Sequence, residues 1–446
     1  MHALARTVVR VAVGSGEHNV SPGAWAVDDN VTMPSQPEGE QPPERGELPA
    51  ASASRWGEQP FSVYVHVPFC ATRCGYCDFN TYTALELAGR PRPGAGLDDP
   101  PQVSRATFGT HLADEVGFAR QVLGSRDVPV ANVFVGGGTP TLLTPEALGG
   151  VLTRIRSEFG LIDGAEITTE ANPDSVDEAA LAGLLEAGFT RVSFGMQSAV
   201  PHVLATLDRT HTPGGALTAV EQAKRAGFER ISLDLIYGTP GESLSDWETT
   251  VEAALAADVG HVSAYALIVE DGTRLAASVR RGAIAAPDDD LMADMYDLAD
   301  ERFAAAGLDW YELSNWSRPG HECRHNLAYW HGEDWWGIGP GAHSHIAGTR
   351  WWNVKHPSAY VQRLRGGHSP AVGREVLDPD TRRVEDVLLR VRLAEGLPVT
   401  GLDPSQIDQV VGEGLAQRRG DGPDTRLVLT RPGRLLADAV VRRLLG

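Results

Sequence analysis

Two stretches of this chain repeat one another, and the repeat restricts the fold more than any other feature of the sequence. EAGFTRVSFG begins at Glu186 and RAGFERISLD begins at Arg225, so the two stretches lie 39 residues apart, the length of one helix plus one strand. A third, weaker copy, GHVSAYAL, begins at Gly260. A repeated unit of this kind predicts successive βα units, which build a parallel sheet covered by helices.

Short β-branched runs alternate with helix-period segments over residues 59–275. Ser175 with Glu178 predicts a capping box at one helix start, and Gly188 and Gly227 predict left-handed helix ends. Six such units are too few for the usual eight-stranded barrel, so we expect an α/β fold with a partial (β/α)6 barrel. The candidate strands are SVYVHV, ANVFVG, AEITTE, TRVSFG, ERISLD and HVSAYAL.

The segments on either side of this region have a different composition. Residues 1–58 are rich in Pro, Gly, Glu and Ser without periodicity, which predicts a disordered leader, and a subsidiary hypothesis makes Met33 the true start. Residues 276–369 predict a helical extension rich in aromatic residues and histidine. Residues 370–446 predict a smaller, mainly helical, winged-helix-like C-terminal domain.

Charge and cysteine content exclude several classes of protein. Lys and Arg number 39 against 59 Asp and Glu, a formal charge of -20 that argues against nucleic acid or an anionic membrane as the main partner. No run approaches the ~20 apolar residues of a membrane-spanning helix. Four cysteines are too few for a disulfide framework, and the N-terminus lacks a signal peptide, so we expect a cytoplasmic protein.

Three of the four cysteines, Cys70, Cys74 and Cys77, lie together in HVPFCATRCGYCDFN, directly after the first predicted strand. This position opens on the C-terminal face of the sheet, where barrel active sites are found. Three thiolates at this spacing can bind three irons of a [4Fe-4S] cluster and leave the fourth iron without a protein ligand. A structural zinc site is the alternative, but it needs four ligands, and Cys323 is far away in the chain. Inert thiols are a further alternative.

Polar or flexible residues follow several predicted strands at the same end. GGGTP at residues 136–140 would let the backbone approach a ligand closely, although it also fits a plain turn. Glu170 ends the third strand, Gln197 follows the fourth, Arg209 lies in LDRTH, and Asp234 ends the fifth. Strand ends on one edge of a parallel sheet lie close together, so these residues predict a binding site for a polar ligand.

The cysteine motif C-x3-C-x2-C resembles the signature of the radical S-adenosylmethionine superfamily. YVHVPFC, GGGTPT, EANP, FGMQS and DLIYGTPGE, within residues 61–360, resemble its oxygen-independent coproporphyrinogen oxidase branch. The resemblance implies S-adenosylmethionine on the open iron, whose cleavage to a 5′-deoxyadenosyl radical is the chemistry of the cofactor. It also implies contacts to S-adenosylmethionine from Tyr64, Tyr76, Gly137, Gly138, Thr139, Glu170, Gln197, Arg209 and Asp234.

One residue departs from the porphyrinogen-decarboxylating members of that branch, because Phe79 stands where they carry an extra cysteine. CDFN from Cys77 and HNLAYW from His325 resemble the HemW-type heme chaperones. That resemblance implies a protein that binds heme and transfers it to an acceptor hemoprotein, for example a respiratory one, with no catalytic residue assigned and homodimerisation left open. The rival hypothesis is an oxygen-independent coproporphyrinogen III oxidase.

The stretch from His321 to His345 contains five of the 14 histidines, interleaved with tryptophans. Imidazole is a suitable ligand for iron, and large apolar rings suit a porphyrin face, which makes this stretch a candidate heme contact with His325 as the favoured residue. The same residues could equally be structural and simply pack in the core. Covalent attachment of heme to Cys323 is a minor alternative, because no C-x-x-C-H motif is present.

Overall fold

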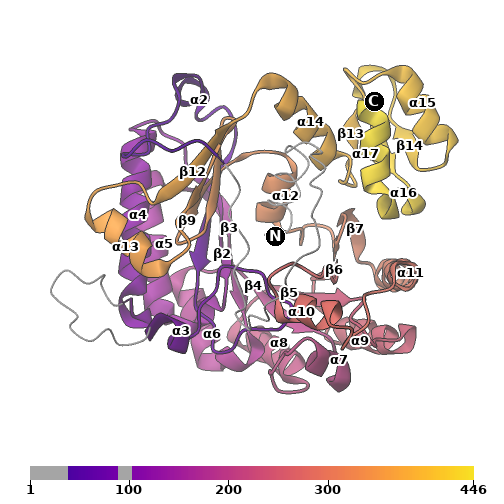
Figure 1. Ribbon diagram of the computed structural model, residues 1–446, viewed down its shortest axis with the longest axis horizontal. Coiled ribbons are helices and arrows are strands. Elements are labelled where there is room, and N and C mark those ends of the chain that lie inside the picture. Colours follow the sequence, from indigo (N-terminus) through magenta and orange to yellow (C-terminus); the bar gives the residue numbers. More distant parts are fainter. Residues whose placement is uncertain (1–38, 89–102) are drawn as a thin grey trace, which may run out of the picture.

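The computed structural model describes residues 39–88 and 103–446 (Figure 1). Its main body is one mixed sheet with the strand order β12-β11-β10-β9-β1-β2-β3-β4-β5-β6-β8-β7. Nowhere in the described ranges is a helix both long and apolar enough to cross a membrane.

The centre of the sheet consists of the six predicted strands, which pair in parallel from neighbour to neighbour. Most of their residues are buried, as a sheet flanked on both faces requires. The prediction of an α/β fold with a six-unit partial barrel is confirmed. The strands are β1 (Phe61–Val67), β2 (Val130–Gly137), β3 (Leu161–Ala171), β4 (Arg191–Gln197), β5 (Arg230–Tyr237) and β6 (His261–Ala266).

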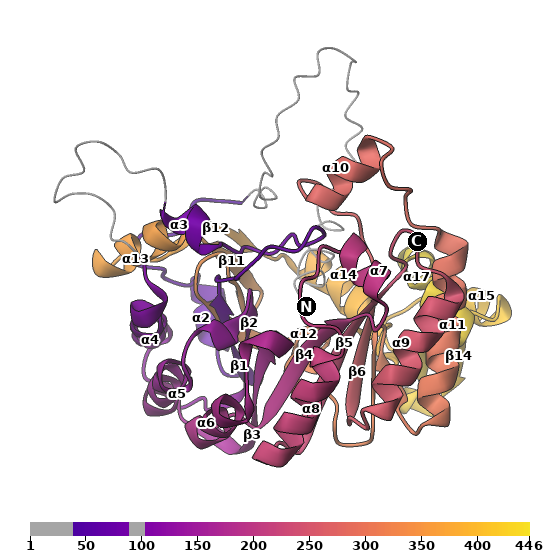
Figure 2. The same cartoon turned by 90° about the horizontal axis from the view of Figure 1, so that it is seen from below.

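Helices that connect these strands lie along the outer face of the sheet (Figure 2). In α5, Leu148, Val151, Leu152 and Ile155 form a buried stripe with helical spacing, which explains why the helix packs against the sheet. The helices in sequence order are α4 (Arg105–Leu123), α5 (Pro145–Phe159), α6 (Glu178–Ala187), α7 (Pro201–Thr206), α8 (Gly215–Ala226) and α9 (Leu244–Ala256).

The sequence repeat corresponds to α6 with β4 and α8 with β5. Both helices end at a left-handed glycine, Gly188 with φ 105° and Gly227 with φ 110°, as predicted. The predicted capping box was wrong, because α6 is capped by Asp177, whose side chain accepts a hydrogen bond from the Ala180 N–H. Ser175 lies instead in a short 3-10 turn before the helix.

The segment predicted as a helical extension contributes strands to the same sheet. β9 pairs in parallel with β1, and β8 pairs antiparallel with β6, so the extension adds to both edges of the six-stranded core. The helical prediction for 276–369 was therefore only partly right. The strands are β7 (Asp309–Glu312), β8 (Asn315–Ser317), β9 (Asp334–Ile338), β10 (His343–Ile346) and β11 (Thr349–Asn353); the helices are α10 (Arg274–Arg280), α11 (Asp289–Ala305), α12 (Arg324–Trp330) and α13 (Pro357–Arg365).

The C-terminal unit starts later than predicted. β12 (Ala371–Val376) pairs with β11 and so belongs to the main sheet, which corrects the boundary at residue 370. The unit beyond it combines helices with a three-stranded sheet of order β13-β15-β14 and has its own hydrophobic core. Its elements are α14 (Pro379–Arg390), β13 (Leu397–Pro398), α15 (Pro404–Gly412), β14 (Ala416–Arg419), β15 (Arg426–Leu429), α16 (Arg431–Leu435) and α17 (Ala437–Leu445).

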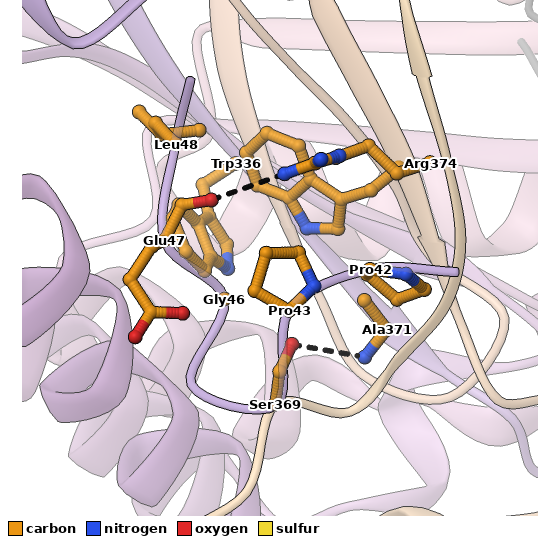
Figure 3. A pocket seen from close by; sticks show the side chains of 10 residues that line it. Pro42, Pro43, Gly46, Glu47, Leu48, Trp336, Ser369, Ala371 and Arg374 are labelled. Carbon is orange, nitrogen blue, oxygen red and sulfur yellow. Dashed lines mark hydrogen bonds between the residues drawn. The ribbon is translucent and has the colours of Figure 1, made fainter. Parts of the chain in front are cut away.

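Residues 39–58 are ordered, contrary to the prediction of a disordered leader up to residue 58. Glu40 pairs with Arg374 at the edge of β12, and this segment continues into α2 (Ala50–Arg55). Figure 3 shows its prolines beside Trp336 in a small pocket that Arg374 also lines. The amino-acid composition did not indicate this order, because the segment is held by strands that are distant in the sequence. Residues 1–38, including Met33, lie outside the described residues.

Candidate cluster and S-adenosylmethionine site

The three clustered cysteines lie on the loop that leaves the carboxyl end of β1, and all three are unpaired and half-buried. The Cys70 N–H donates to the Tyr82 backbone oxygen at 3.1 Å, which fixes the start of the loop. The Cys77 N–H donates to the Cys74 oxygen at 3.3 Å, so the last two cysteines share a tight turn. The cysteine loop therefore lies at the C-terminal face of the sheet, as predicted.

The glycine-rich turn after β2 packs directly against this loop. The Thr139 N–H donates to the Phe69 oxygen at 2.7 Å, and the Gly138 N–H donates to the Val67 oxygen at 2.8 Å. A Cβ atom on Gly138 would lie 2.4 Å from the Phe69 oxygen and 3.1 Å from the Cys70 sulfur. Glycine is therefore required here for the close approach of the two segments rather than for a turn alone.

Burial and the neighbouring cysteines affect the ionisation of Cys70 and Cys77. Burial raises the pKa of Cys77 to about 12, and Cys70 and Cys74 contribute to the rise. Burial, followed by the neighbouring Cys74, also raises the pKa of Cys70. Such thiols stay protonated on their own, and metal coordination is what converts buried thiols of this kind to thiolates.

No three His, Cys, Asp or Glu side chains of the described residues are arranged to hold a single metal ion. A four-iron cube is instead held by thiolates around its corners. Cys323, the fourth ligand that a zinc site would need, lies in a separate buried cluster with Tyr64 and Phe134. The three-thiol loop therefore fits a [4Fe-4S] cluster with one open iron better than it fits zinc.

Arg209 joins the cysteine loop to the end of β4. Its guanidinium donates from Nη1 to the Cys74 sulfur at 3.6 Å, from Nη2 to the Gly195 oxygen at 3.0 Å, and from Nε to His211 Nδ1 at 3.1 Å. The Gln197 side chain lies beside the Arg209 guanidinium. A Cβ atom on Gly195 would lie 2.7 Å from Gln197 Nε2 and 2.9 Å from Arg209 Nη2. The structure thus brings these two predicted site residues together beside a cysteine.

Gln197 also has an unusual backbone conformation. It is the last residue of β4 and has a φ of 64°, the left-handed region that side chains other than glycine and asparagine rarely adopt. The parallel pairing of β4 with β5 shifts register between Gly195 and Gln197. Strain of this kind costs about 1–3 kcal/mol and is common at functional sites, so the role of Gln197 as a site residue stays a prediction.

Two buried carboxyl groups, Glu170 on β3 and Asp234 on β5, lie on strands that are separated by β4. Glu170 accepts a hydrogen bond from the Gly137 N–H at 3.1 Å. Asp234 accepts hydrogen bonds from the Ser193 hydroxyl at 2.9 Å and the Ser263 hydroxyl at 2.8 Å. Asp234 lies within β5, which continues to Tyr237, so its prediction as a strand end was wrong by three residues.

The electrostatics of this pair favour a cationic ligand. Burial, followed by the neighbouring Asp234, raises the pKa of Glu170 to about 7. Burial also raises the pKa of Asp234. A nearby positive group stabilises the ionised form of buried carboxyl groups that repel each other.

The two tyrosines that the resemblance implied have different surroundings. Tyr76 lies in the cysteine loop, where burial, followed by the neighbouring Cys74, raises its pKa well above the usual value. The Tyr64 hydroxyl contacts His66 Nδ1 at 3.0 Å, and its ring lies parallel to those of Phe134 and His325 at centroid distances of 6.4 and 6.3 Å. Tyr64 therefore belongs to a packed aromatic cluster on the inner side of the sheet.

His325 does not fit the predicted role as a heme contact. It is fully buried on α12, and burial lowers the pKa of its ring to about 3. Its Nδ1 is hydrogen-bonded to the Asn132 side chain, and its Nε2 to the Tyr329 hydroxyl at 3.0 Å. An iron ligand needs one free ring nitrogen, and both are occupied here. The structural alternative describes His325 better.

Other residues of the same stretch are divided between core and surface. Trp336 is buried in the main hydrophobic core, and burial lowers the pKa of His345 to about 4. The His331 side chain remains 28% exposed and contacts Glu395 at 3.2 Å. Of the five histidines in this stretch, His325 is buried, whereas His321, His331, His343 and His345 are partly exposed.

Two residues beside the cysteine loop were not singled out from the sequence. His66 Nε2 is 2.9 Å from the Asn80 backbone oxygen, and the Asn80 side chain reaches a turn some 260 residues further along the chain. The only available signal was that both stand in the quoted motifs YVHVPFC and CDFN. Nothing local in the sequence distinguishes them from ordinary polar neighbours of a cysteine.

Comparison with known proteins agrees with this geometry. Residues 64–254 match the family model described as the radical SAM superfamily. The heme chaperone HemW of Mycobacterium tuberculosis is 54% identical over 392 residues, which are 87% of this chain and 95% of that protein. The chain belongs to the HemW family of radical SAM proteins. Another member, the heme chaperone HemW of Bacillus subtilis, is 32% identical over 86% of this chain and 99% of its own length.

A solved structure shares the fold of this family member. The coproporphyrinogen III oxidase HemN from Escherichia coli aligns with a TM-score of 0.72 over 88% of this chain and 92% of its own, at 20% sequence identity. At that identity the likeness concerns the fold alone. It shows that the α/β fold described above is shared over most of both chains.

Proposed function

We propose that this protein is a cytoplasmic heme chaperone that binds heme and transfers it to an acceptor hemoprotein. The names of its relatives support the proposal, since proteins 54% and 32% identical over most of their length are named heme chaperone HemW. The protein would carry a [4Fe-4S] cluster on Cys70, Cys74 and Cys77 and an exchangeable S-adenosylmethionine beside it.

The observation that carries the cofactor proposal is the cysteine loop, which provides three thiols within one surface loop and no fourth. Such a cluster offers an open iron to the amino and carboxylate groups of S-adenosylmethionine. Around it, Glu170 and Asp234 would attract the positive groups of S-adenosylmethionine, and Arg209 would offset the negative charge of the thiolates.

The remaining proposed contacts lie around the same loop. The Gly137–Thr139 turn would receive the methionyl group, because its backbone is hydrogen-bonded directly to the cysteine loop. Tyr76 lies next to Cys74, and Gln197 next to Arg209. Tyr64 would contribute to the site indirectly, through its contact with His66.

The experiment begins with anaerobic reconstitution and analysis of bound iron and sulfide, followed by heme titration monitored at the Soret band. Transfer is then measured by mixing the heme-loaded protein with apo-myoglobin as a probe acceptor. Cys70→Ser should lose the cluster, whereas Cys323→Ser, the matched control, should keep it because Cys323 lies in a separate buried cluster. A protein that binds no heme, or that does not release heme to the probe, would contradict the proposal.

The heme contact can be located with the same titration. His331→Ala and His343→Ala remove partly exposed rings, whereas His325→Ala removes a ring with both nitrogens occupied. We expect an altered Soret band from one of the exposed positions. An effect limited to His325→Ala would restore the original assignment.

A coproporphyrinogen III oxidase is the second candidate, favoured by the fold that the chain shares with HemN. Phe79 argues against it, since it replaces the extra cysteine that the resemblance leads us to expect in such enzymes. Decarboxylated product from coproporphyrinogen III, formed under reducing anaerobic conditions, would establish this activity and displace the chaperone proposal.

A further inference from the structure

Asn80 follows the last cysteine of the loop by three residues, and its side chain is almost completely buried, with 5% exposed. Its Nδ2 donates two hydrogen bonds of 2.9 Å, one to the Pro340 backbone oxygen and one to the Lys355 backbone oxygen. Its Oδ1 has no hydrogen-bond partner within the described part of the chain. The side chain is therefore held by its two N–H groups alone, and both reach segments far from the loop in sequence.

The backbone of Asn80 is fixed as well, from the opposite side. Its carbonyl oxygen can only accept, so His66 Nε2 donates to it across 2.9 Å. Burial lowers the pKa of His66 to about 4, and the neutral ring then accepts at Nδ1 from the Tyr64 hydroxyl at 3.0 Å. One connected chain of hydrogen bonds thus runs from Tyr64 through His66 and Asn80 to Pro340.

The turn that receives Asn80 is shaped for close contact. A Cβ atom on Gly341 would lie 2.6 Å from Asn80 Nδ2, and one on Gly339 would lie 2.4 Å from the His66 oxygen. Both glycines have positive φ, 74° and 105°. Any larger residue would push the turn away from the cysteine loop.

The turn is itself held in place by the interior of the protein. The Gly339 N–H donates to Glu115 Oε2 on α4 at 2.7 Å, and the Gly339 oxygen accepts from Asn353 Nδ2 at 2.9 Å. Because the turn is anchored on two further elements, it is a fixed support rather than a segment that follows the loop.

We propose that Asn80 is a positioning residue of the cluster site, which holds the cysteine loop against the turn at residues 337–341 and so sets the position of the loop relative to β1 and the S-adenosylmethionine contacts. This inference rests on the cluster part of the proposed function. The residue acts through the loop and does not itself touch the metal. Without its two N–H donors the loop keeps its three cysteines and its contacts to the Gly138 turn, but it loses the side-chain link to the turn at residues 337–341.

The test compares Asn80→Ala, which removes both donors, with Asn80→Asp, which turns a carboxylate oxygen toward two carbonyl oxygens. Reconstituted proteins are exposed to an iron chelator, and the rate of loss of the cluster absorbance is measured. We expect loss about tenfold faster in Asn80→Ala, the factor that corresponds to about 1.4 kcal/mol, and faster still in Asn80→Asp. A rate in Asn80→Ala equal to that of the wild-type protein would show that the donors are not what holds the loop.

A matched control separates positioning from general stability. Asn132 is also an almost buried asparagine, 3% exposed, but it lies near the start of β2, away from the carboxyl ends of the strands. Asn80→Ala should shift the midpoint potential and the EPR spectrum of the reduced cluster, whereas Asn132→Ala should leave both unchanged even if the two variants lower Tm equally.

The outcomes distinguish this inference from the proposed function. If the wild-type protein holds no cluster, the proposed function fails and the inference fails with it. If the wild-type protein holds a cluster and Asn80→Ala has the wild-type rate, potential and EPR spectrum, only the role of Asn80 is refuted. Asn80→Ser, the mildest change, provides the same readouts if a larger change prevents folding.

Discussion

Glu170 should make the binding of S-adenosylmethionine depend on pH. Burial and the neighbouring Asp234 raise the pKa of Glu170 to about 7, so its ionisation changes within the physiological range. S-adenosylmethionine carries a positively charged sulfonium group, and a carboxylate attracts it only when the carboxylate is ionised. Binding should therefore strengthen as pH rises through 7.

The size of the effect follows from that pKa. If S-adenosylmethionine binds only to the ionised form, the apparent Kd is multiplied by 1 plus the ratio of protonated to ionised Glu170. With a pKa of about 7, this factor is about 11 at pH 6 and about 1.1 at pH 8. The affinity should thus fall about tenfold, or about 1.4 kcal/mol, between pH 8 and pH 6.

The assay is anaerobic equilibrium dialysis of S-adenosylmethionine against the reconstituted protein between pH 6 and pH 8, with bound iron measured at each pH. Glu170→Gln should bind more weakly at pH 8 and lose the pH dependence. Glu312→Gln is the matched control, because burial also raises the pKa of Glu312, whose side chain accepts hydrogen bonds from Asn315 and Asn326 instead. A tenfold pH dependence that survives in Glu170→Gln would refute the assignment of Glu170 to the cation.

Three further predictions concern stability and cluster binding. Burial raises the pKa of Glu115 from 4.5 to about 7; its contribution to stability is fully present below pH 4.5 and is lost as pH rises through 7, about 3 kcal/mol in all. The free energy of unfolding of Glu115→Gln, measured in urea, should not fall in this way as pH rises. A fall parallel to that of the wild-type protein would contradict the prediction. Cys74→Ser should abolish iron binding in reconstituted protein, and iron content equal to Cys323→Ser would argue against a three-cysteine site. Trp330→Ala should destabilise the C-terminal unit, whose core it shares, by about 3–5 kcal/mol, and unchanged proteolysis after β12 would show otherwise.

The parallel core and the cysteine loop were predictable from the sequence because their signals are local. Alternating β-branched runs and glycine-ended helices identify βα units, and the repeat at Glu186 and Arg225 spans one such unit. The spacing of Cys70, Cys74 and Cys77 within one loop defines its chemistry without reference to the rest of the fold. Parallel strands then bring their carboxyl ends to one edge, which places Glu170 and Gln197 near the cysteines.

What the sequence could not indicate depends on contacts between distant segments. β9 pairs with β1, and Glu40 pairs with Arg374, although composition predicted a helical extension and a disordered leader. The sequence predicted His325 as an iron ligand, but its ring is hydrogen-bonded to Asn132, which lies 193 residues earlier in the chain.

The sequence by itself determined which residues have the chemistry of the site, since cysteine spacing and strand-end residues are read from the chain directly. Only the tertiary structure decided their state. The burial that raises the pKa of Glu170 to about 7 and the turn that holds Asn80 both arise from segments far away in the chain. The physical reason is that burial and hydrogen-bond partnership are properties of the packed interior, where any part of the chain can be a neighbour.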